Sequence, residues 1–355
     1  MNKETNEGKK LKDTVCAVVV TYNRKNLLLE CLEALLKQTR PIDAIYIIDN
    51  FSNDGTPEVL KENGYITDLP PENINEPWEK EFETKNLTDG KPVKIHYVRM
   101  NKNTGGAGGF YEGVKRGYER GYDWLWLMDD DAEPREDALE KLSKYFNNGT
   151  LSALASSVVL TNGIISHKDR GSHINSNQNY PLSQKPLELR AYENLYVEID
   201  MASFVGILIN RRAIEKIGYP RKEFFIYHDD TDYCIRLRHV GKILLIPDSV
   251  IIHKEASHAE IKKSFMGRKS LRTPYDKFWL NYYINRNLVW LGKQYSTSKI
   301  NFYLGLSKNF MKSIIGVLIY DDNKIKRINL IINSYIDGLK GNFDNEKPKR
   351  ILYKK

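Results

Sequence analysis

Short apolar runs and one helical stripe open the chain. Val15 to Val20 is a continuous run of apolar, mostly β-branched residues, typical of a strand that is buried on both faces. Asn26 to Thr39 places apolar residues at helical spacing, and Ile45 to Ile48 is again a short apolar run. A strand, a helix and a strand in this order predict a parallel α/β sheet with a right-handed crossover.

The pattern changes in the next hundred residues. Residues 63–93 have little periodicity, which predicts a surface insertion, and strand character returns at Lys94 to Val98. Trp124 to Met128 is apolar and predicts another buried strand. Pro134 stands where the first position of a helix is expected, and an apolar stripe continues that helix to Phe146.

The second half begins with alternating strands and loops and ends in helices. Residues 166–190 are polar and predict a loop, whereas Ser249 to Ile252 predicts a strand. From Tyr282 onward the spacing is helical. We therefore expect an α/β domain over residues 1–270 and a helical, basic region over residues 271–355.

Positive charge gathers near the C-terminus. The chain has a net charge of +8, and residues 291–355 hold 13 Lys and Arg against 5 Asp and Glu. Such a region suits an anionic membrane surface or a nucleic acid, and it can also be a merely solvated tail. Because Phe, Tyr, Leu and Ile are interleaved with Lys, without a platform of stacking residues and arginines, we expect peripheral membrane contact and no nucleic-acid partner.

The remaining composition indicates a protein that is kept inside the cell. The first residues are polar and charged, without the apolar stretch of a secretory signal. The apolar run Ile314 to Tyr320 is far shorter than the ~20 residues that span a bilayer. Cys16, Cys31 and Cys234 are widely spaced, which favours free buried thiols in a reducing compartment. We expect a cytoplasmic protein at the inner face of the cell membrane.

Three adjacent acids follow the apolar run that ends at Met128. Asp129, Asp130 and Asp131 would repel one another unless a cation neutralised them. Hard oxygen ligands suit Mg²⁺ or Mn²⁺, and ligands of open α/β sheets bind at the carboxyl ends of strands. The alternative is a solvated acidic turn that caps the helix at Pro134. His253, after the predicted strand 249–252, is a candidate third ligand, although a lone histidine is more often structural.

A second acidic cluster lies between residues 228 and 232. Apolar residues lead into His228, Asp229 and Asp230, and Asp232 follows within the start of a helix. Asp230 or Thr231 could simply cap that helix. Three carboxylates exceed what a cap needs, so one of them is a candidate general base. In an extended lead-in, adjacent side chains point to opposite sides, so only one of Asp229 and Asp230 can face a cleft.

A glycine-rich run covers Asn103 to Phe110. It matches neither a dinucleotide fingerprint nor a phosphate loop with its lysine. Its glycines permit a close approach of the backbone to something, for example a ligand, and a flexible helix start.

In order and spacing, these segments resemble glycosyltransferase family 2, whose members have the GT-A fold. The similarity covers Val15 to His253, about two thirds of the chain. It rests on VVVTYNR, IIDNFSNDGT, the glycine-rich run, the triple Asp and FFIYHDDTDYCIRL. The later Tyr282 to Asn287 resembles a Tyr…Arg-Asn element of the rhamnosyl and galactofuranosyl branches. The resemblance implies an α/β GT-A fold, with a mostly parallel Rossmann-like sheet and a C-terminal helical extension.

The resemblance also implies roles for individual residues. Asp129 and Asp131 would be the DxD motif that holds Mn²⁺ or Mg²⁺, with His253 as a further ligand. Asp230 would be the catalytic base, with Asp229 and His228 beside the acceptor; His228 departs from the branch, which carries Trp there. The residues implied along the donor nucleotide are Thr21, Asn23, Arg24, Asp49 (at the uracil or thymine edge), Asn103, Gly105, Gly106 and Asp130.

One base without an enzymic nucleophile predicts a single displacement with inversion. The resemblance favours galactofuranose from UDP-galactofuranose, moved to a cell-surface glycan or a polyprenyl-linked saccharide. A rhamnosyltransferase that uses dTDP-rhamnose is the alternative. A sugar nucleotidyltransferase would need a Gly- and Arg-rich phosphate loop after the first strand, where TYNR stands instead. A non-catalytic sugar-binding protein would have no reason to keep two acidic clusters.

Overall fold

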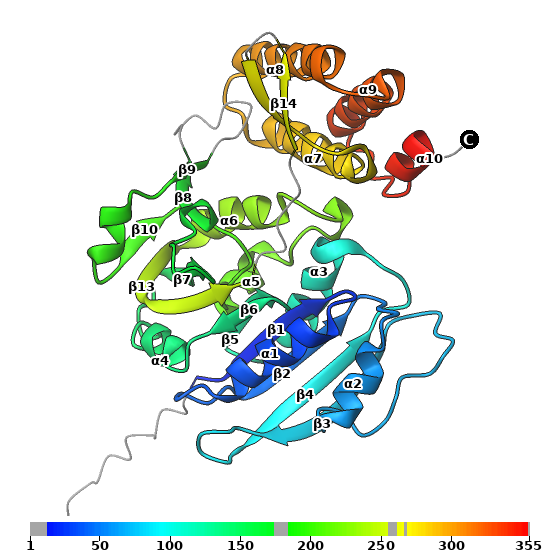
Figure 1. Ribbon diagram of the computed structural model, residues 1–355. Helices are drawn as coiled ribbons and strands as arrows, with labels where there is room; N and C mark the ends of the chain where they lie inside the picture. The colour runs from blue at the N-terminus through cyan, green and yellow to red at the C-terminus, as the bar shows by residue number, and fades with distance from the viewer. Residues whose placement is uncertain (1–12, 174–183, 255–260, 266–267, 354–355) are drawn as a thin grey trace, which may run out of the picture.

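The computed structural model describes residues 13–173, 184–254, 261–265 and 268–353, and it contains one large sheet with helices on both faces (Figure 1). The strands are β1 (Val15–Thr21), β2 (Ala44–Asp49), β3 (Trp78–Lys85), β4 (Pro92–Arg99), β5 (Trp124–Asp129), β6 (Ala132–Pro134), β7 (Leu151–Leu160), β8 (Arg170–His173), β9 (Gln184–Pro186), β10 (Val197–Ile199), β11 (Met201–Ala202), β12 (Ile207–Asn210), β13 (Lys242–His253), β14 (Ile261–Phe265) and β15 (Arg268–Arg272). The helices are α1 (Lys25–Leu36), α2 (Thr56–Glu62), α3 (Gly105–Glu119), α4 (Ala138–Ser143), α5 (Arg211–Ile217), α6 (Asp229–Val240), α7 (Leu280–Tyr295), α8 (Lys299–Tyr320), α9 (Lys324–Lys340) and α10 (Lys347–Tyr353).

The sheet runs in the order β10-β13-β7-β12-β5-β1-β2-β4-β3, and β6 pairs with the end of β13. Strands β5, β1, β2 and β4 are parallel, as are β7 and β13, whereas β12 runs antiparallel between β5 and β7. The predicted mostly parallel α/β sheet is therefore confirmed. Because the parallel strands share a direction, their carboxyl ends meet at one edge of the sheet, where ligands of such folds bind.

Alternate residues of β1 explain why two layers of helices form. Val15, Ala17 and Val19 pack in one core with α1, α2 and α4, while Cys16 and Val18 face a second core with α3, α5 and α6. A strand that is buried on both faces has a continuous run of apolar residues in its sequence. The three cysteines are free and buried, as predicted.

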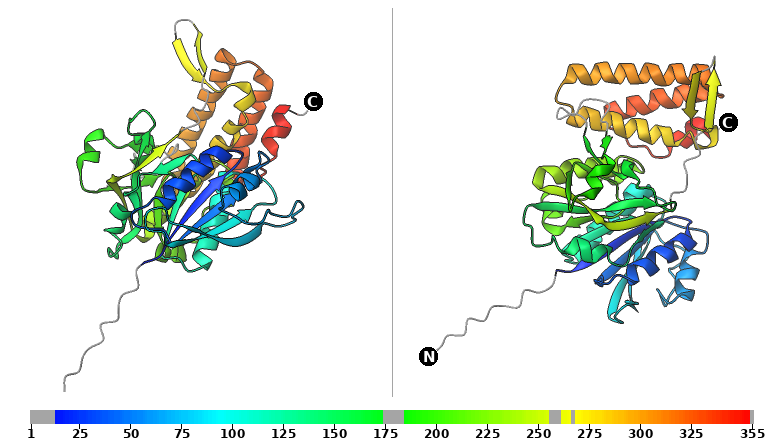
Figure 2. Two further views of the ribbon diagram at one scale, coloured as in Figure 1. Left: turned by 60° about the horizontal axis from the view of Figure 1, so that its bottom comes forward. Right: turned by 60° about the vertical axis from the view of Figure 1, so that its left-hand side comes forward.

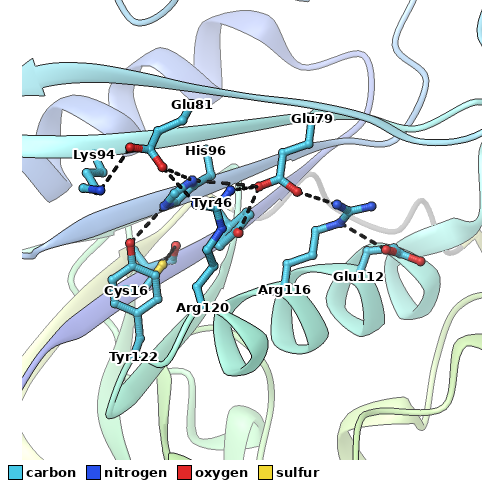
Figure 3. Close-up of polar contacts among 11 residues, drawn as sticks. Cys16, Tyr46, Glu79, Glu81, Lys94, His96, Glu112, Arg116, Arg120 and Tyr122 are labelled. Carbon is cyan, nitrogen blue, oxygen red and sulfur yellow. Dashed lines mark hydrogen bonds and ion pairs between the residues drawn. The ribbon is translucent and has the colours of Figure 1, made fainter.

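The segment predicted as a surface insertion, residues 63–93, contains the edge strand β3 at residues 78–85, which the sequence pattern did not indicate. β3 pairs antiparallel with β4 along its whole length. On the face toward α3, Glu79 and Glu81 of β3 form ion pairs with Arg116 of α3 and with Arg120, the residue that follows this helix (Figure 3). An edge strand that packs through ion pairs lacks the apolar alternation that would reveal it.

Two further predictions of local structure are corrected. Pro134 does not begin a helix, because it ends β6 opposite Ile251 of β13, and α4 starts only at Ala138. A proline fits an edge strand, where its missing N–H is not needed. The polar segment 166–190, predicted as a loop, contributes β8 and β9 to a small sheet with β11; residues 174–183 of that segment lie outside the described residues.

The C-terminal helices form a layer with a core of their own. Tyr282 and Val289 of α7, Val317 of α8 and Leu330 of α9 are buried together. α7 is the helix of this layer that faces α6 and the sheet domain, and α8 lies on the far side (Figures 1 and 2). The β14–β15 hairpin packs along α8, so the boundary predicted after residue 270 falls within β15.

α8 is longer than the apolar run Ile314 to Tyr320 indicated. It has 22 residues, and by length and composition alone it is long and apolar enough to cross a membrane. The run Ile314 to Tyr320 therefore understates the length of the apolar segment, because the helix continues through residues that interrupt the run. Most of its apolar stretch is not buried inside the protein.

Candidate active site

The three adjacent acids lie at the carboxyl end of β5, where the polypeptide turns sharply into β6. Asp130 points back to β1, and its Oδ2 accepts a hydrogen bond of 2.7 Å from Oγ1 of Thr21. The guanidinium of Arg24 bridges the acids, with Nη1 at 3.3 Å from Asp130 and 2.9 Å from Asp131. Thr21 and Arg24 therefore hold the acidic turn against the loop after β1. Asp130, predicted on the donor, is engaged with these two residues.

Asp129, Asp131 and His253 form a cluster that fits a metal ion. One potential ligand atom from each lies within 4.8 Å of the other two. His253 is brought there by the last pairing of β13, opposite Ala132 of β6. Nε2 of His253 lies 3.1 Å from Oδ1 of Asp131, yet this oxygen is buried without a hydrogen-bond partner among the described residues, as is Nδ1 of His253. Two carboxylates and an imidazole suit Mn²⁺ or Mg²⁺.

The electrostatics of the cluster also favour a cation. Burial and the neighbouring Asp131 and Asp130 raise the pKa of Asp129 to about 7. Burial raises the pKa of Asp130 to about 6. For Asp131, burial alone would raise the pKa, but His253 and Arg24 outweigh it and the pKa is lowered. A positive charge between these groups would offset the repulsion that the protein only partly compensates.

The second acidic cluster opens α6. Asp229 and Asp230 lie in the first turn of the helix, not in an extended lead-in, so the argument from opposite-facing neighbours does not apply. Neither Asp230 nor Thr231 is the N-cap, because that position belongs to His228, which has a left-handed backbone (φ 66°). Asp230 accepts hydrogen bonds from the backbone and hydroxyl of Thr231. The capping interpretation is therefore wrong.

Burial sets the protonation of this second cluster. It raises the pKa of Asp230 to about 6, and it raises the pKa of Asp229 well above its ordinary value, with help from Asp230 and Asp129. The influence of Asp129 on Asp229 means that both acidic clusters share one electrostatic environment. Burial lowers the pKa of His228 to about 4, so its imidazole is neutral near pH 7. Asp232 instead pairs with Arg221 and Arg236.

The loop after β2 is built on internal hydrogen bonds. Asp49 is fully buried, and its carboxylate accepts from Ser52 N, from the Tyr97 hydroxyl at 2.7 Å and from Arg99 at 2.6 Å. Its predicted contact with a nucleobase stays a prediction, since the carboxylate already has three partners. Asn23, also predicted on the donor, has a left-handed backbone, and its side chain accepts from Asn53 N at 2.7 Å.

The glycine-rich run starts α3, and most of its glycines leave room for other parts of the protein to pack closely against the backbone. Gly105 has φ +72°, and a Cβ there would lie 2.0 Å from the carbonyl oxygen of Phe225. A Cβ on Gly109 would meet Val20 of β1 at 2.5 Å. Of the two glycines predicted to lie along the donor, Gly105 and Gly106, only Gly106 faces open space. Asn103 accepts from Gly105 N at 2.8 Å and thereby shapes the start of the helix.

Sequence reasoning missed two neighbours of the predicted donor residues. Asn50 is buried and ties the loop after β2 to the start of α3, since its side chain contacts Asn103, Thr104 and Gly105. Phe51 has an exposed ring that lies 5.0 Å from the guanidinium of Arg99. Both stand next to Asp49 in IIDNFSNDGT, so that motif was the available signal. An exposed aromatic ring beside a nucleotide pocket is a candidate surface for base stacking.

A family model named Glycosyl transferase family 2 matches residues 16–68 and 79–218, more than half of the chain. The chain belongs to this family. The matched range includes nearly all of β1, the glycine-rich run and the three acids that follow β5. This glycosyltransferase is therefore neither a sugar nucleotidyltransferase nor a non-catalytic sugar-binding protein.

Curated relatives are similar over about two thirds of their length. The chain is 26% identical over 239 residues to the galactofuranosyltransferase GlfT1 of Mycolicibacterium smegmatis, covering 64% of this chain and 67% of the relative. It is 27% identical over 278 residues to GlfT1 of Mycobacterium tuberculosis, covering 74% of this chain and 77% of the relative. It is 23% identical over 253 residues to the dTDP-rhamnosyl transferase RfbF of Shigella flexneri, covering 68% and 70%.

Solved structures share the fold at low identity. The first 349 residues of S. aureus TarS match with a TM-score of 0.52 and 13% identity, over 96% of this chain and 83% of that one. GalNAc-T7, solved with UDP, GalNAc and Mn²⁺, matches with a TM-score of 0.51 and 13% identity, over 95% of this chain and 59% of that one. These likenesses support the GT-A assignment of the glycosyltransferase.

Proposed function

We propose that this glycosyltransferase moves galactofuranose from UDP-galactofuranose onto a cell-surface glycan or a polyprenyl-linked saccharide, with inversion at the anomeric carbon. The observation that carries the proposal is a pair of acidic clusters: Asp129, Asp131 and His253, whose potential ligand atoms lie within 4.8 Å of one another, and the half-buried carboxylate of Asp230 at the start of α6. The similarity to GlfT1 supports the choice of donor.

The first cluster would hold the donor diphosphate. Asp129, Asp131 and His253 would bind a Mn²⁺ or Mg²⁺ ion, which, when bound, supplies Lewis-acid stabilisation of the nucleoside diphosphate that leaves. Arg24 keeps the acidic turn in place through Asp130 and Asp131. Asn103, Gly105 and Gly106 would line the donor at the start of α3, where Gly106 faces open space.

Asp230 would accept the proton of the acceptor hydroxyl as that oxygen attacks the anomeric carbon. A base works best when its pKa lies near the working pH, and burial has raised the pKa of Asp230 to about 6. Asp229 has a still more strongly raised pKa, so it would be the protonated partner that donates a hydrogen bond to the acceptor. His228, a neutral imidazole, would contact the acceptor from the residue before them.

The donor can be tested with a two-donor assay. We expect UDP release from UDP-galactofuranose to exceed dTDP release from dTDP-rhamnose by about tenfold or more, because a pocket that pairs with one sugar's hydroxyls rejects another. The assay would use purified enzyme, Mn²⁺ and a panel of alkyl glycosides, with the anomeric configuration of the product read by NMR. Faster dTDP release would establish the rhamnosyltransferase alternative that RfbF represents, and retention of configuration would overturn the single displacement.

We further infer peripheral contact with the inner face of the cell membrane through α8. Apolar side chains form an exposed stripe along this helix, and Lys308 and Lys312 lie beside it. Lysines in the middle of a helix are costly at the centre of a bilayer, whereas at its surface they reach the anionic headgroups. The arrangement therefore supports a helix that lies in the interface rather than one that spans. The stripe consists of Ile300, Tyr303, Leu304, Met311, Ile315, Leu318 and Ile319.

A matched pair of charge substitutions tests the membrane contact. Leu304→Glu on α8 should weaken binding to phosphatidylglycerol vesicles about tenfold or more, because burial of one leucine contributes about 1.5–3 kcal/mol. Leu195→Glu changes a still more exposed leucine of the sheet domain and should leave binding unchanged. Co-sedimentation with vesicles measures both. Equal binding by the two variants would remove α8 from the membrane contact.

A further inference from the structure

The backbone just before the acidic cluster of α6 is held in an unfavourable conformation. Phe225, Tyr227 and His228 have φ values of 66°, 68° and 66°, in the left-handed region that side chains with a Cβ rarely adopt. Such residues persist only where the surroundings impose the conformation, and they concentrate at functional sites. The segment 224–228, which we call the lead-in loop, ends at Asp229 and Asp230, so its shape determines where these carboxylates lie.

Two buried side chains of α7 hold the lead-in loop. Nδ2 of Asn287 lies within hydrogen-bond distance of three carbonyl groups of this loop, those of Phe224 (3.1 Å), Ile226 (3.1 Å) and Tyr227 (2.8 Å). Nη2 of Arg286 donates to the Phe224 carbonyl at 2.9 Å, and its Nε donates to Oδ1 of Asn287 at 2.9 Å. Both side chains are fully buried. The amide donors of Asn287 therefore replace the water that these turned-in carbonyls would otherwise need.

The opposite side of the lead-in loop meets the donor side of the site. The carbonyl oxygen of Phe225 accepts from Ala107 N at 3.0 Å, and Gly105 leaves the room that this approach needs. The Phe225 ring stacks on Tyr283 of α7, with ring centroids 4.9 Å apart. The loop is thus enclosed between α3, which carries the glycine-rich run, and α7 of the C-terminal layer.

We propose that Asn287, supported by Arg286, is a positioning residue for the transfer step: it fixes the lead-in loop so that Asp230 reaches the acceptor hydroxyl. The inference rests on the proposed function of Asp230 and assigns a role to the Tyr…Arg-Asn element that the sequence showed. Ordinary docking of two layers would require apolar contact only. Here a buried side-chain amide of the C-terminal layer contacts three carbonyl groups of one strained segment. The position of the proposed base therefore depends on the C-terminal layer.

Asn287→Asp is the sharpest variant, because it keeps the shape and the acceptor for Arg286 but replaces the amide donors with oxygen. We expect kcat to fall by about 10²-fold, as a misplacement of about 1 Å can cost. Binding of UDP with Mn²⁺ should stay within about threefold, because the metal cluster lies on β5 and β13. The acidic limb of the kcat–pH profile, expected near pH 6, should also move, since the burial of Asp230 would change.

Three controls separate positioning from stability. Asn329→Asp makes the same change at an exposed site of α9, and Val317→Ala opens the core of the C-terminal layer away from the loop; both should keep kcat. Asn287→Ala replaces Asn287→Asp if the latter does not fold. The proposal is overturned if a folded Asn287 variant keeps kcat within about threefold of wild type. It is also overturned if Val317→Ala lowers kcat as much as the Asn287 variant does. Wild-type turnover by Asp230→Asn would instead refute the proposed base, whatever Asn287 does.

Discussion

Replacing Asp131 with alanine should lower turnover by about 10³-fold while the protein stays folded. The change removes the carboxylate that Arg24 and His253 contact and one of three side chains that would bind the metal ion. Electrostatic stabilisation of a leaving diphosphate amounts to several kcal/mol, and about 4 kcal/mol corresponds to about 10³-fold in rate. Asp129→Ala should have an effect of the same order. Release of nucleoside diphosphate, with and without added Mn²⁺, measures it.

A nearby acid serves as the control for this prediction. Asp137 is half-buried at the N-cap position of α4, where it pairs with Lys141, and Asp137→Ala should leave turnover unchanged. The wild-type enzyme should also lose activity in excess chelator and regain it with Mn²⁺ or Mg²⁺. Wild-type rates for both Asp129→Ala and Asp131→Ala, or full turnover in chelator, would mean that a metal ion at this cluster is not needed.

Asp230→Asn should lower kcat by about 10²- to 10⁴-fold, the contribution of a positioned base. Asparagine keeps the oxygen that accepts from Thr231 but cannot take a proton. The pH profile gives a second result. Because burial raises the pKa of Asp230 to about 6, wild-type kcat should fall about tenfold per pH unit below that value, as the carboxylate becomes protonated. The residual activity of Asp230→Asn should lack this decline.

Ionisation of Asp230 should lower the free energy of unfolding as pH rises, whereas it should raise kcat. An unfolded aspartate loses its proton near pH 4, whereas the folded Asp230 retains it to about pH 6. Between these values the folded state binds more protons, so stability falls as pH rises and the ionised group remains destabilising at neutral pH. Asp230→Asn removes this cost, and thermal unfolding at pH 7.5 should occur at an equal or higher temperature. A lower melting temperature with unchanged kcat would make Asp230 a structural residue.

Asp229→Asn is the variant that separates two adjacent acids. It should weaken acceptor binding and raise KM, with a smaller change in kcat than Asp230→Asn shows. If Asp229→Asn is inactive and Asp230→Asn transfers sugar normally, the base is Asp229. If both transfer normally, the second acidic cluster has no part in proton removal.

The elements that sequence analysis predicted well are those whose burial alone determines the pattern. β1, β2 and β5 are buried on both faces, so their apolar runs are continuous, and their shared direction brings Thr21 and Asp129 to one edge. The residue types made His253 a candidate ligand beside Asp131, but the sequence did not show that the two meet, because 121 intervening residues must fold first. β3 was missed because only Trp78 and Phe82 pack against the core, while Glu79 and Glu81 on the other face form ion pairs with Arg116 and Arg120.

Internal hydrogen bonding was the other property that sequence could not supply. Asp49 stands in a motif that indicates nucleotide binding, yet Tyr97 and Arg99 of the neighbouring strand occupy its carboxylate. Gly105 was assigned to a ligand, whereas the close neighbour that excludes a side chain is the Phe225 carbonyl. In both cases the partner comes from a distant segment, and neither composition nor periodicity records that contact.

In the proposed mechanism, one acidic cluster holds the donor and the other removes the acceptor proton. Calorimetric titration of UDP in the presence of Mn²⁺ tests this most directly, with wild type, Asp131→Ala and Asp230→Asn side by side. We expect Mn²⁺-dependent UDP binding to be lost in Asp131→Ala and to stay within about threefold of wild type in Asp230→Asn. Equal binding by wild type and Asp131→Ala, or loss of binding in Asp230→Asn, would contradict this division between the two clusters.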